Sequence, residues 1–291
     1  MTPTWTVWPA PAKLNLFLHI TGRRADGYHE LQTMFRLLDW GDDVRLRLRA
    51  DGRIERHRGA PGVTPQDDLA VRAARRLSSR LGDVPGVDID IDKRIPSGAG
   101  LGGGSSDAAT VLVALNVLWQ GGLTEQELAQ IALELGADVP LFVHGRSAWG
   151  EGVGERLTPV DLGPAWYVLL DPHEPVSTGA LFSAPELTRD APKETISRFL
   201  LGAVTGNAFE APVRARHSRV AAALDWLGAS ATARLTGSGG VVFAEFADRD
   251  EARAIAARCP QEFTAIVAGG VDRSPLLAVV DRFRVGASPS W

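Results

Sequence analysis

The stretch that decides the fold is Pro96-Ser97-Gly98-Ala99-Gly100-Leu101-Gly102-Gly103-Gly104-Ser105-Ser106-Asp107, in which five glycines fall within seven residues. In residues 87–95, just before it, apolar side chains alternate with three aspartates, which predicts a half-buried strand. Residues 108–119 are mostly apolar and predict a buried helix, with Ser105, Ser106 and Asp107 as N-cap candidates. Free N–H groups and the helix dipole make such an arrangement an anion site. The sequence therefore predicts a loop that binds a phosphate chain.

Other interpretations of this loop fit less well. Residues 98–103 match the dinucleotide pattern G-x-G-x-x-G, but the preceding strand alternates with aspartates, and the acids about twenty residues on, Glu125 and Glu127, lie at a predicted helix start. The Walker A pattern fails because no lysine follows the glycines. The eukaryotic type of protein kinase fails because the chain contains neither H-R-D nor D-F-G. A flexible surface linker does not explain why the loop lies between a strand and an apolar helix.

The composition indicates a soluble globular protein of one large or two ordinary domains, with 291 residues, 45% of them hydrophobic and 23% charged. The net charge of −4 argues against a general nucleic-acid binder. No apolar run is long enough to cross a membrane, and the N-terminus does not resemble a signal peptide. A single cysteine, Cys259, favours a cytoplasmic location, and the six histidines lack the spacing of a zinc site.

Hydrophobic periodicity predicts strands and helices that do not alternate strictly, and therefore an α+β fold in two lobes. The pattern restarts after residue 155, so the predicted domains are 1–155 and 156–291. Thr124 and Glu127 predict a capping box, with Gly136 after the helix end. Strands are predicted at 7–21 (a pair broken at Pro9-Ala10-Pro11), 44–49, 166–170 and 263–267, and a glycine turn that leads into a strand is predicted at 235–244. Helices are predicted at 67–81, 124–135, 213–226 and 251–258.

Two charged residues are candidates for catalysis. Only three of the 31 cationic residues are lysines, which indicates that Lys13 serves where a compact ammonium is needed. Lys13 and Asn15 share one face of the predicted strand, although a lysine whose stem covers apolar surface is the alternative. Asp138 is a carboxylate among apolar residues and is a candidate general base, or orienting group, for an alcohol that attacks a γ-phosphate. The alternative is an ordinary helix N-cap, with Pro140 just inside the helix.

The glycine loop resembles the P-x-x-x-G-L-G-S/G-S-S signature of the GHMP kinases. Residues 11–18 and 24–31 are similar to the N-terminal signature of the branch whose alcohol substrate carries a cytidine diphosphate. Residues 136–140 and 236–240 are similar to two further motifs, so the resemblance extends from residue 9 to about 280. It implies a two-lobed α+β fold whose N-terminal lobe is like ribosomal protein S5 domain 2, with a smaller α+β lobe at the C-terminal end.

The resemblance also implies the site residues and the reaction. Lys13 and Asp138 would be the catalytic pair, and ATP with Mg²⁺ would phosphorylate the tertiary 2-hydroxyl of a cytidine diphosphate-linked methylerythritol in non-mevalonate isoprenoid biosynthesis. The binding partner would be this small molecule, and the protein would be a monomer or a homodimer. The ATP phosphates would lie on Pro96, Ser97, Gly98, Ala99, Gly100, Leu101, Gly102, Gly103, Gly104, Ser105 and Ser106, and the alcohol substrate on Asn15, Tyr28, His29, Thr178 and Phe182.

The implied cytosine pocket is also reasonable on physical grounds. Aromatic faces can sandwich a pyrimidine, and each such stack contributes about 1–3 kcal/mol. Tyr28 lies in a polar turn beside His29, which is an unusual place for a core aromatic, although a surface aromatic is the alternative. Phe182, taken alone, is typical of a core residue. We expect Tyr28 and Phe182 to cover opposite faces of the base.

The chain departs from the family pattern in two places. Asp68 stands where the family usually has an asparagine on the adenine side, and Ala208 stands where an acid is common. The Mg²⁺ ligands are not assigned by the resemblance, and the hydroxyls of Ser105 and Ser106 are the candidates. Three alternative functions stay open: a GHMP kinase for homoserine or mevalonate, a ligand-sensing module without activity, and a nicotinamide-dependent dehydrogenase.

Overall fold

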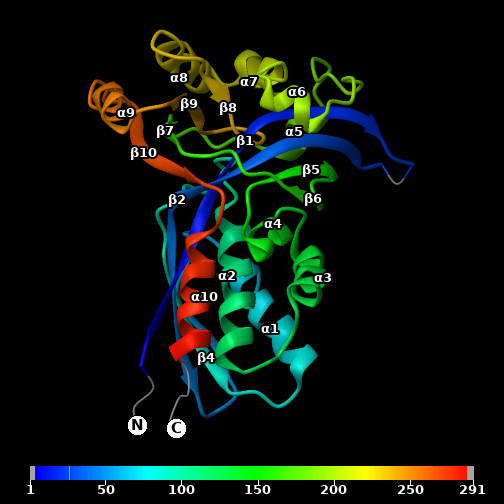
Figure 1. Cartoon of the computed structure of the whole chain (residues 1–291), viewed down its shortest axis with the longest axis vertical. Coiled ribbons are helices and arrows are strands. Elements are labelled where there is room, and N and C mark those ends of the chain that lie inside the picture. Colours follow the sequence, from blue (N-terminus) through cyan, green and yellow to red (C-terminus); the bar gives the residue numbers. More distant parts are fainter. Residues whose placement is uncertain (1–3, 26, 287–291) are drawn as a thin grey trace.

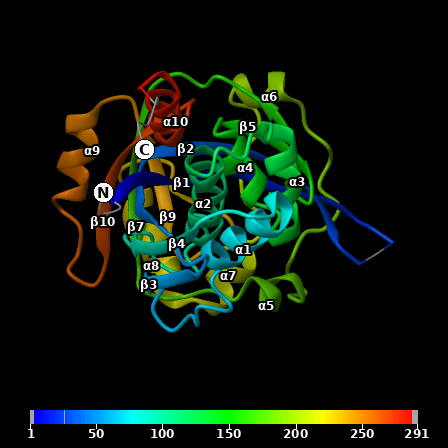
Figure 2. The ribbon, with the colours of Figure 1, turned by 90° about the horizontal axis from the view of Figure 1, so that it is seen from below.

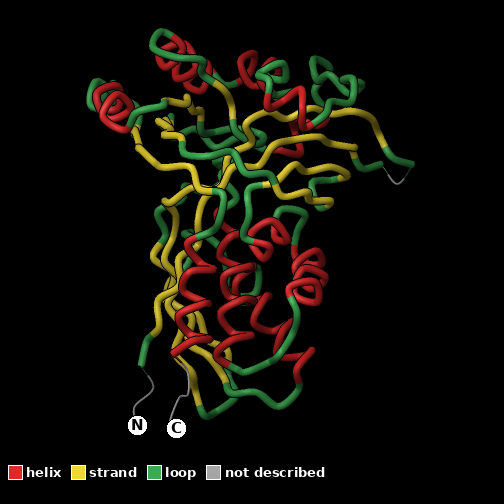
Figure 3. Tube along the Cα trace, viewed as in Figure 1, coloured by secondary structure: helices red, strands yellow, loops and turns green. Residues whose placement is uncertain are grey.

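The computed structural model describes residues 4–25 and 27–286, so Asp26 of the N-terminal signature lies outside the described residues. Within the described part of the chain the strands form one ten-stranded sheet, with helices packed against it (Figure 1, Figure 3). Its main path runs β3-β4-β2-β10-β7-β9-β8, while β1 pairs with β2 and β5 pairs with both β2 and β6. Most neighbours are antiparallel, and β3 and β4 are parallel. The predicted α+β class is confirmed.

The predicted strands are present in the structure, but residues 29–43 of the long strand β2 and several short strands were not predicted. The alternation of residues 87–95 is realised in β4, where Val87, Ile89 and Ile91 are buried. The strands are β1 Thr6–Arg23, β2 His29–Arg49, β3 Ile54–Arg58, β4 Gly86–Asp92, β5 Ala148–Gly152, β6 Arg156–Pro159, β7 Ala165–Asp171, β8 Arg234–Leu235, β9 Val242–Phe246 and β10 Thr264–Val271.

The helices include the predicted capping box, since Thr124 and Glu127 bond reciprocally at the start of α3 and Gly136 follows its end. The helices are α1 Leu69–Leu81, α2 Gly103–Leu118, α3 Glu125–Leu135, α4 Val139–His144, α5 Thr178–Phe182, α6 Ile196–Leu200, α7 Glu210–Arg216, α8 Ser218–Gly228, α9 Arg249–Ala256 and α10 Pro275–Gly286. No helix in the described part of the chain combines the length and the apolar character that crossing a bilayer requires.

The hairpin of β1 and β2 runs through both halves of the molecule (Figure 1), and its strand β1 carries Lys13, one of the two catalytic candidates. The predicted break at Pro9-Ala10-Pro11 is wrong, because β1 continues through it. Within the sheet β1 pairs only with β2, and an edge strand tolerates residues that cannot donate a hydrogen bond. The irregularity is a register shift between Pro11 and Lys13. This shift lies next to Lys13, one of the two candidates for catalysis.

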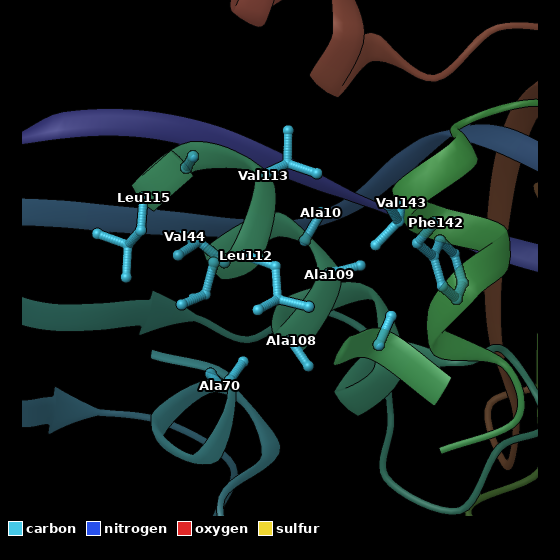
Figure 4. Close-up of a cluster of buried hydrophobic side chains, with 14 of the residues drawn as sticks. Ala10, Val44, Ala70, Ala108, Ala109, Leu112, Val113, Leu115, Phe142 and Val143 are labelled. Atoms are coloured by element: carbon cyan, nitrogen blue, oxygen red, sulfur yellow. The ribbon is translucent and has the colours of Figure 1, made fainter. Parts of the chain in front are cut away.

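The N-terminal core is built around α2, which is apolar on nearly all sides and buried along most of its length. Leu112 and Val113 of α2 lie among side chains from β1, β2, α1 and α4 (Figure 4). The C-terminal helix α10 returns to this core (Figure 2). Its Phe283 stacks on Trp8 of β1 with a centroid distance of 4.6 Å. Elements from early and late in the chain therefore both contribute to the core around α2.

Leu18 and Ile20, near the turn of the hairpin, belong to a second core. Other members of this core come from β7, β9 and the helices α5, α7 and α8. The predicted helix at 213–226 is wrong in one respect, since α7 and α8 are separate. His217 separates them with a non-helical backbone, and its ring bonds to Glu174 at 3.0 Å. The other oxygen of Glu174 accepts the N–H of Arg219 in the first turn of α8. The Glu174 carboxylate thus stabilises the start of α8 as a separate helix.

Candidate active site

The glycine loop lies between β4 and the N-terminus of α2, as the sequence predicted. The N-cap prediction is wrong, because α2 starts at Gly103 and its N-cap is Gly102, in the left-handed region and without a side-chain hydrogen bond. Gly100 also has a positive φ of 75°, and a Cβ there would lie 2.1 Å from the carbonyl oxygen of Thr236. With glycine at positions 102–104, α2 begins before Ser105 and therefore earlier than predicted. Its first N–H groups, which have no intrahelical partner, are left for an anion.

We expect Gly100→Ala to destabilise the protein and to impair ATP binding. The added Cβ would meet backbone rather than a flexible side chain, and an unfavourable φ alone costs about 1–3 kcal/mol. Gly104→Ala is the matched control for stability, because its Cβ would have no neighbour closer than 3.7 Å and alanine favours a helix. Thermal unfolding measures both variants. Equal melting temperatures for the two would contradict the close approach of the loops.

The two serines of the loop have different surroundings. The hydroxyl of Ser106 is fully buried and donates to the carbonyl of Pro11 at 2.7 Å, so it ties α2 to β1. The side chain of Ser105 is partly exposed. Of the two candidate hydroxyls, Ser105 is therefore the one that can face a ligand without losing an internal bond.

Lys13 lies on β1 at the register shift and is almost completely buried, with 3% of its surface exposed. Its ammonium donates to Asn15 Oδ1 at 2.6 Å and lies 3.5 Å from Asp138 Oδ2. The ring of Phe35 lies 5.6 Å away and contributes a cation–π contact. Lys13 is thus an ordered ammonium inside the molecule, and the alternative of a lysine covering apolar surface does not apply.

Asp138 occupies the N-cap position of α4, with Pro140 in the first turn. The position agrees with the N-cap alternative, but its carboxylate makes no capping hydrogen bond and is paired with Lys13 instead. About a third of the Asp138 side chain is exposed, at 35%, so one side of the carboxylate is accessible. A carboxylate and an ammonium next to an anion-binding loop can orient an alcohol, accept its proton and stabilise negative charge on phosphate.

Two partners of Asn15, Thr33 and Thr236, were not predicted as site residues. Asn15 donates from its amide to Thr33 on β2, and its backbone N–H donates to the hydroxyl of Thr236 at 3.0 Å. Thr236 in turn donates to the carbonyl of Gly100 at 3.3 Å, so it joins β1 to the glycine loop. Thr236 belongs to a motif that the sequence singles out. Thr33 has only a weak signal, as a polar residue in a strand that is buried there.

The predicted base pocket is brought together in part. His29 at the start of β2 stacks on Phe182 of α5, with ring centroids 4.7 Å apart and planes at 15°. Burial lowers the pKa of His29, and the charges of Arg23 and Arg189 lower it further, so the surroundings favour the neutral ring. Tyr28 is 66% exposed beside it. His29, and not an open space, therefore covers one face of Phe182.

Thr178 lies at the start of α5, where its hydroxyl is 2.5 Å from the hydroxyl of Ser238. This bond ties the helix that carries Phe182 to the loop of residues 236–240. Thr236, in the same loop, contacts Gly100 on the phosphate side. The predicted alcohol side and phosphate side of the site therefore meet at this loop, and Ser238 is a contact that the sequence reasoning missed.

Asp68, the acid on the predicted adenine side, is occupied by internal partners. It caps α1 by accepting the N–H of Ala70 at 2.9 Å, and it pairs with Arg56 at 2.5 Å. Only 6% of Asp68 is exposed. The acid therefore serves the helix start and the arginine, which accounts for its presence in place of the family's asparagine. Nothing in the structure explains Ala208.

The second lysine, Lys93, lies behind the glycine loop. Its ammonium contacts Asp42 at 2.5 Å and Asp107 at 2.7 Å. Burial raises the pKa of Asp107 to about 7. The other oxygen of Asp42 accepts the N–H groups of Arg94 and Ile95. This cluster holds the chain where it leaves β4, so a compact ammonium is used inside the molecule at Lys93 as well as at Lys13.

Comparison with known proteins agrees with this geometry. The profile of the GHMP kinase N-terminal domain matches residues 68–146, and that of the GHMP kinase C-terminal domain matches residues 193–265. The chain belongs to the GHMP kinases, and its predicted two-lobed fold is confirmed. Its family makes it an ATP-dependent small-molecule kinase.

Within this family, the chain is most usefully compared with three proteins. A relative from Halorhodospira halophila, named 4-diphosphocytidyl-2-C-methyl-D-erythritol kinase, is 56% identical over 286 residues, which cover 97% of this chain and 99% of the relative. A crystal structure of 4-(cytidine 5'-diphospho)-2C-methyl-D-erythritol kinase aligns with a TM-score of 0.81 and 33% identity, over 91% of this chain and 99% of that one. A homoserine kinase from Cytophaga hutchinsonii aligns with a TM-score of 0.67 and 18% identity, over 94% and 96% of the two chains, which shows the shared fold alone.

Proposed function

We propose that this protein transfers the γ-phosphate of ATP to the tertiary 2-hydroxyl of 4-diphosphocytidyl-2-C-methyl-D-erythritol, a step of non-mevalonate isoprenoid biosynthesis. The observation that carries the proposal is the 56% identity, over nearly the full length of both chains, to a relative with that name. The pair of Lys13 and Asp138 beside the glycine loop supports it, because a tertiary alcohol is a hindered nucleophile that needs exact placement. A ligand-sensing module would have no need of this ordered pair.

The site residues are proposed in these roles. Asp138 orients the hydroxyl and takes its proton as the new oxygen–phosphorus bond forms and the bond from the γ-phosphorus to ADP breaks. Lys13 stabilises the negative charge on the attacking and phosphoryl oxygens. The loop from Pro96 to Ser106 supplies backbone N–H groups to the ATP phosphates. Asn15, Tyr28, His29, Thr178 and Phe182 are proposed to hold the alcohol substrate.

Mg²⁺ is proposed to accompany ATP. No group of three or more histidine, cysteine or acidic side chains that could hold a metal occurs among residues 4–25 and 27–286. Mg²⁺ is commonly bound through one or two protein groups together with substrate phosphates and water, so two oxygen donors of the protein would suffice. Ser105 and the exposed side of Asp138 would hold it. When bound, Mg²⁺ neutralises phosphate charge.

Three further properties stay proposals. We propose domains at 1–155 and 156–291, with the refinement that α10 packs into the core of the first. We propose that the protein is a monomer or a homodimer. We also propose that it does not bind nucleic acid. A cytoplasmic location is proposed from the single cysteine.

We expect Tyr28→Ala to raise KM for the cytidine substrate by about 5- to 150-fold, with KM for ATP changed much less. Loss of one base stack removes about 1–3 kcal/mol, and uniform binding of a remote group affects KM before kcat. Phe182→Ala is expected to act in the same direction, and steady-state kinetics with each substrate varied in turn measure both. A larger rise of KM for ATP in Tyr28→Ala would place this residue on the nucleotide side.

An ATP-consumption assay over a panel of alcohols tests the proposed function. The panel contains the cytidine diphosphate-linked methylerythritol, the same alcohol without the cytidine diphosphate, homoserine and mevalonate. Turnover confined to the first compound is expected. Turnover of homoserine or mevalonate would favour those kinases, and absence of any turnover would favour a sensing module. Titration with NAD(H) tests the dehydrogenase alternative, which predicts binding.

A further inference from the structure

The amide of Asn15 has a donor end and an acceptor end, and the two ends face different partners. Its Oδ1 accepts from the Lys13 ammonium at 2.6 Å, and its Nδ2 donates to Thr33 Oγ1 at 2.9 Å. The hydroxyl of Thr33 donates in turn to the backbone carbonyl of Phe17 at 2.5 Å. Lys13, Asn15 and Thr33 are each at most 3% exposed. The side chains that form these hydrogen bonds are therefore buried away from water.

The direction of every bond in this chain follows from its far end. A backbone carbonyl can only accept, so the single proton of the Thr33 hydroxyl is used on Phe17. The Thr33 oxygen can then only accept from Asn15, which must turn its NH₂ group toward β2. The carbonyl end of the amide consequently faces Lys13. We propose that Thr33 is a positioning residue for phosphoryl transfer, which fixes the Asn15 amide so that Lys13 is held beside Asp138.

Loss of the Thr33 hydroxyl would remove this constraint on the amide. The backbone of Asn15 is held separately by Thr236, so only the amide group is free to rotate. A rotated amide would point two N–H groups at the Lys13 ammonium, which has only donors of its own. Lys13 would then lose its shortest contact and move relative to Asp138, which lies 3.5 Å away. ATP would still meet an unchanged glycine loop, because the hydroxyl of Thr33 bonds to Asn15 and Phe17, which lie outside that loop.

Kinetics of Thr33→Val and Thr33→Ser test this inference, which rests on the proposed function. Valine keeps the shape of threonine and removes the hydroxyl, whereas serine keeps the hydroxyl. We expect Thr33→Val to lower kcat by about 2- to 150-fold, the range of coupling within one hydrogen-bond network, with KM for ATP within about twofold. Thr33→Ser should restore most of the loss. Equal activity of Thr33→Val and wild type would overturn the proposal.

The same substitution in an Asn15→Ala background separates positioning from general packing. With no amide to orient, Thr33→Val should lower kcat no further. An effect of Thr33→Val that is as large in Asn15→Ala as in the wild type would show that Thr33 acts through packing alone, and would overturn the proposal. If Thr33→Val does not fold, Thr33→Ala removes the hydroxyl with less demand on space, and its expected results are the same.

A spectroscopic measurement reads the position of Lys13 without any substrate. Since the chain has only three lysines, ¹³Cε-labelled lysine gives three signals, and Lys13→Met identifies one of them. We expect the Lys13 signal of Thr33→Val to move to that of Asn15→Ala, and the signal of Thr33→Ser to stay near the wild type. A Lys13 signal unmoved in Thr33→Val would refute the inference. Absence of wild-type turnover, with these shifts present, would refute the proposed function instead.

Discussion

Asp138→Asn is expected to keep the fold and to lower kcat by about 10²- to 10⁴-fold, the usual contribution of a positioned acid–base group. The carboxylate makes no capping hydrogen bond, so the substitution removes no contact that α4 needs. It does remove the partner of Lys13 and the acceptor for the alcohol proton. Asparagine is close to aspartate in size, so the variant should fold, with a melting temperature lowered by the loss of the ion pair to the buried Lys13.

The matched control for this variant is Asp248→Asn. Asp248 is the N-cap of α9 and accepts the N–H groups of Asp250 and Glu251, so it serves a helix start without any catalytic partner. Steady-state kinetics and thermal unfolding are measured for both variants. A purified Asp138→Asn protein that turns over at nearly the wild-type rate would remove Asp138 from the reaction, and would leave the ion pair with Lys13 as a structural contact only.

Local patterns predicted the elements whose cause is local. The alternation of residues 87–95 and the capping box at Thr124 each depend on neighbours within a few residues, and both are present in the structure. The start of α2 was misplaced because its cap is a left-handed glycine rather than a hydroxyl. The split between α7 and α8 was missed because Glu174, which stabilises it, lies far away in the sequence.

Most of the site was predicted from the family resemblance rather than from single residues. The rarity of lysine and a carboxylate among apolar residues made Lys13 and Asp138 candidates, the resemblance made them a pair, and the structure brings them to 3.5 Å. Thr33 and Ser238 could not be found, because their partners come from other strands and loops. The stack of His29 on Phe182 joins β2 to α5, and no local pattern encodes such a contact. The positions of these residues in the site depend on contacts between segments that are far apart in the sequence.

Lys13→Arg is expected to lower kcat at least about 100-fold, although the positive charge is kept. The loss of one preorganised donor at developing charge costs about 10²- to 10³-fold, and an arginine cannot replace this donor. Lys13 is buried, and a Cβ on Gly102 would already lie 3.1 Å from its Cγ, so the site leaves little room for a wider side chain. A planar guanidinium also cannot occupy the single point, 2.6 Å from Asn15 Oδ1, that the ammonium takes.

Two variants show whether geometry or charge is decisive at this position. Lys13→Met removes the charge, and we expect its kcat to fall about as far as that of Lys13→Arg. Lys193→Arg is the matched control, because Lys193 is exposed and the same exchange there should leave kcat unchanged. Steady-state kinetics on the three purified proteins provide the comparison. An active Lys13→Arg beside an inactive Lys13→Met would mean that Lys13 supplies only a counter-charge. The short contact with Asn15 would then have no part in catalysis, since a guanidinium cannot reproduce it.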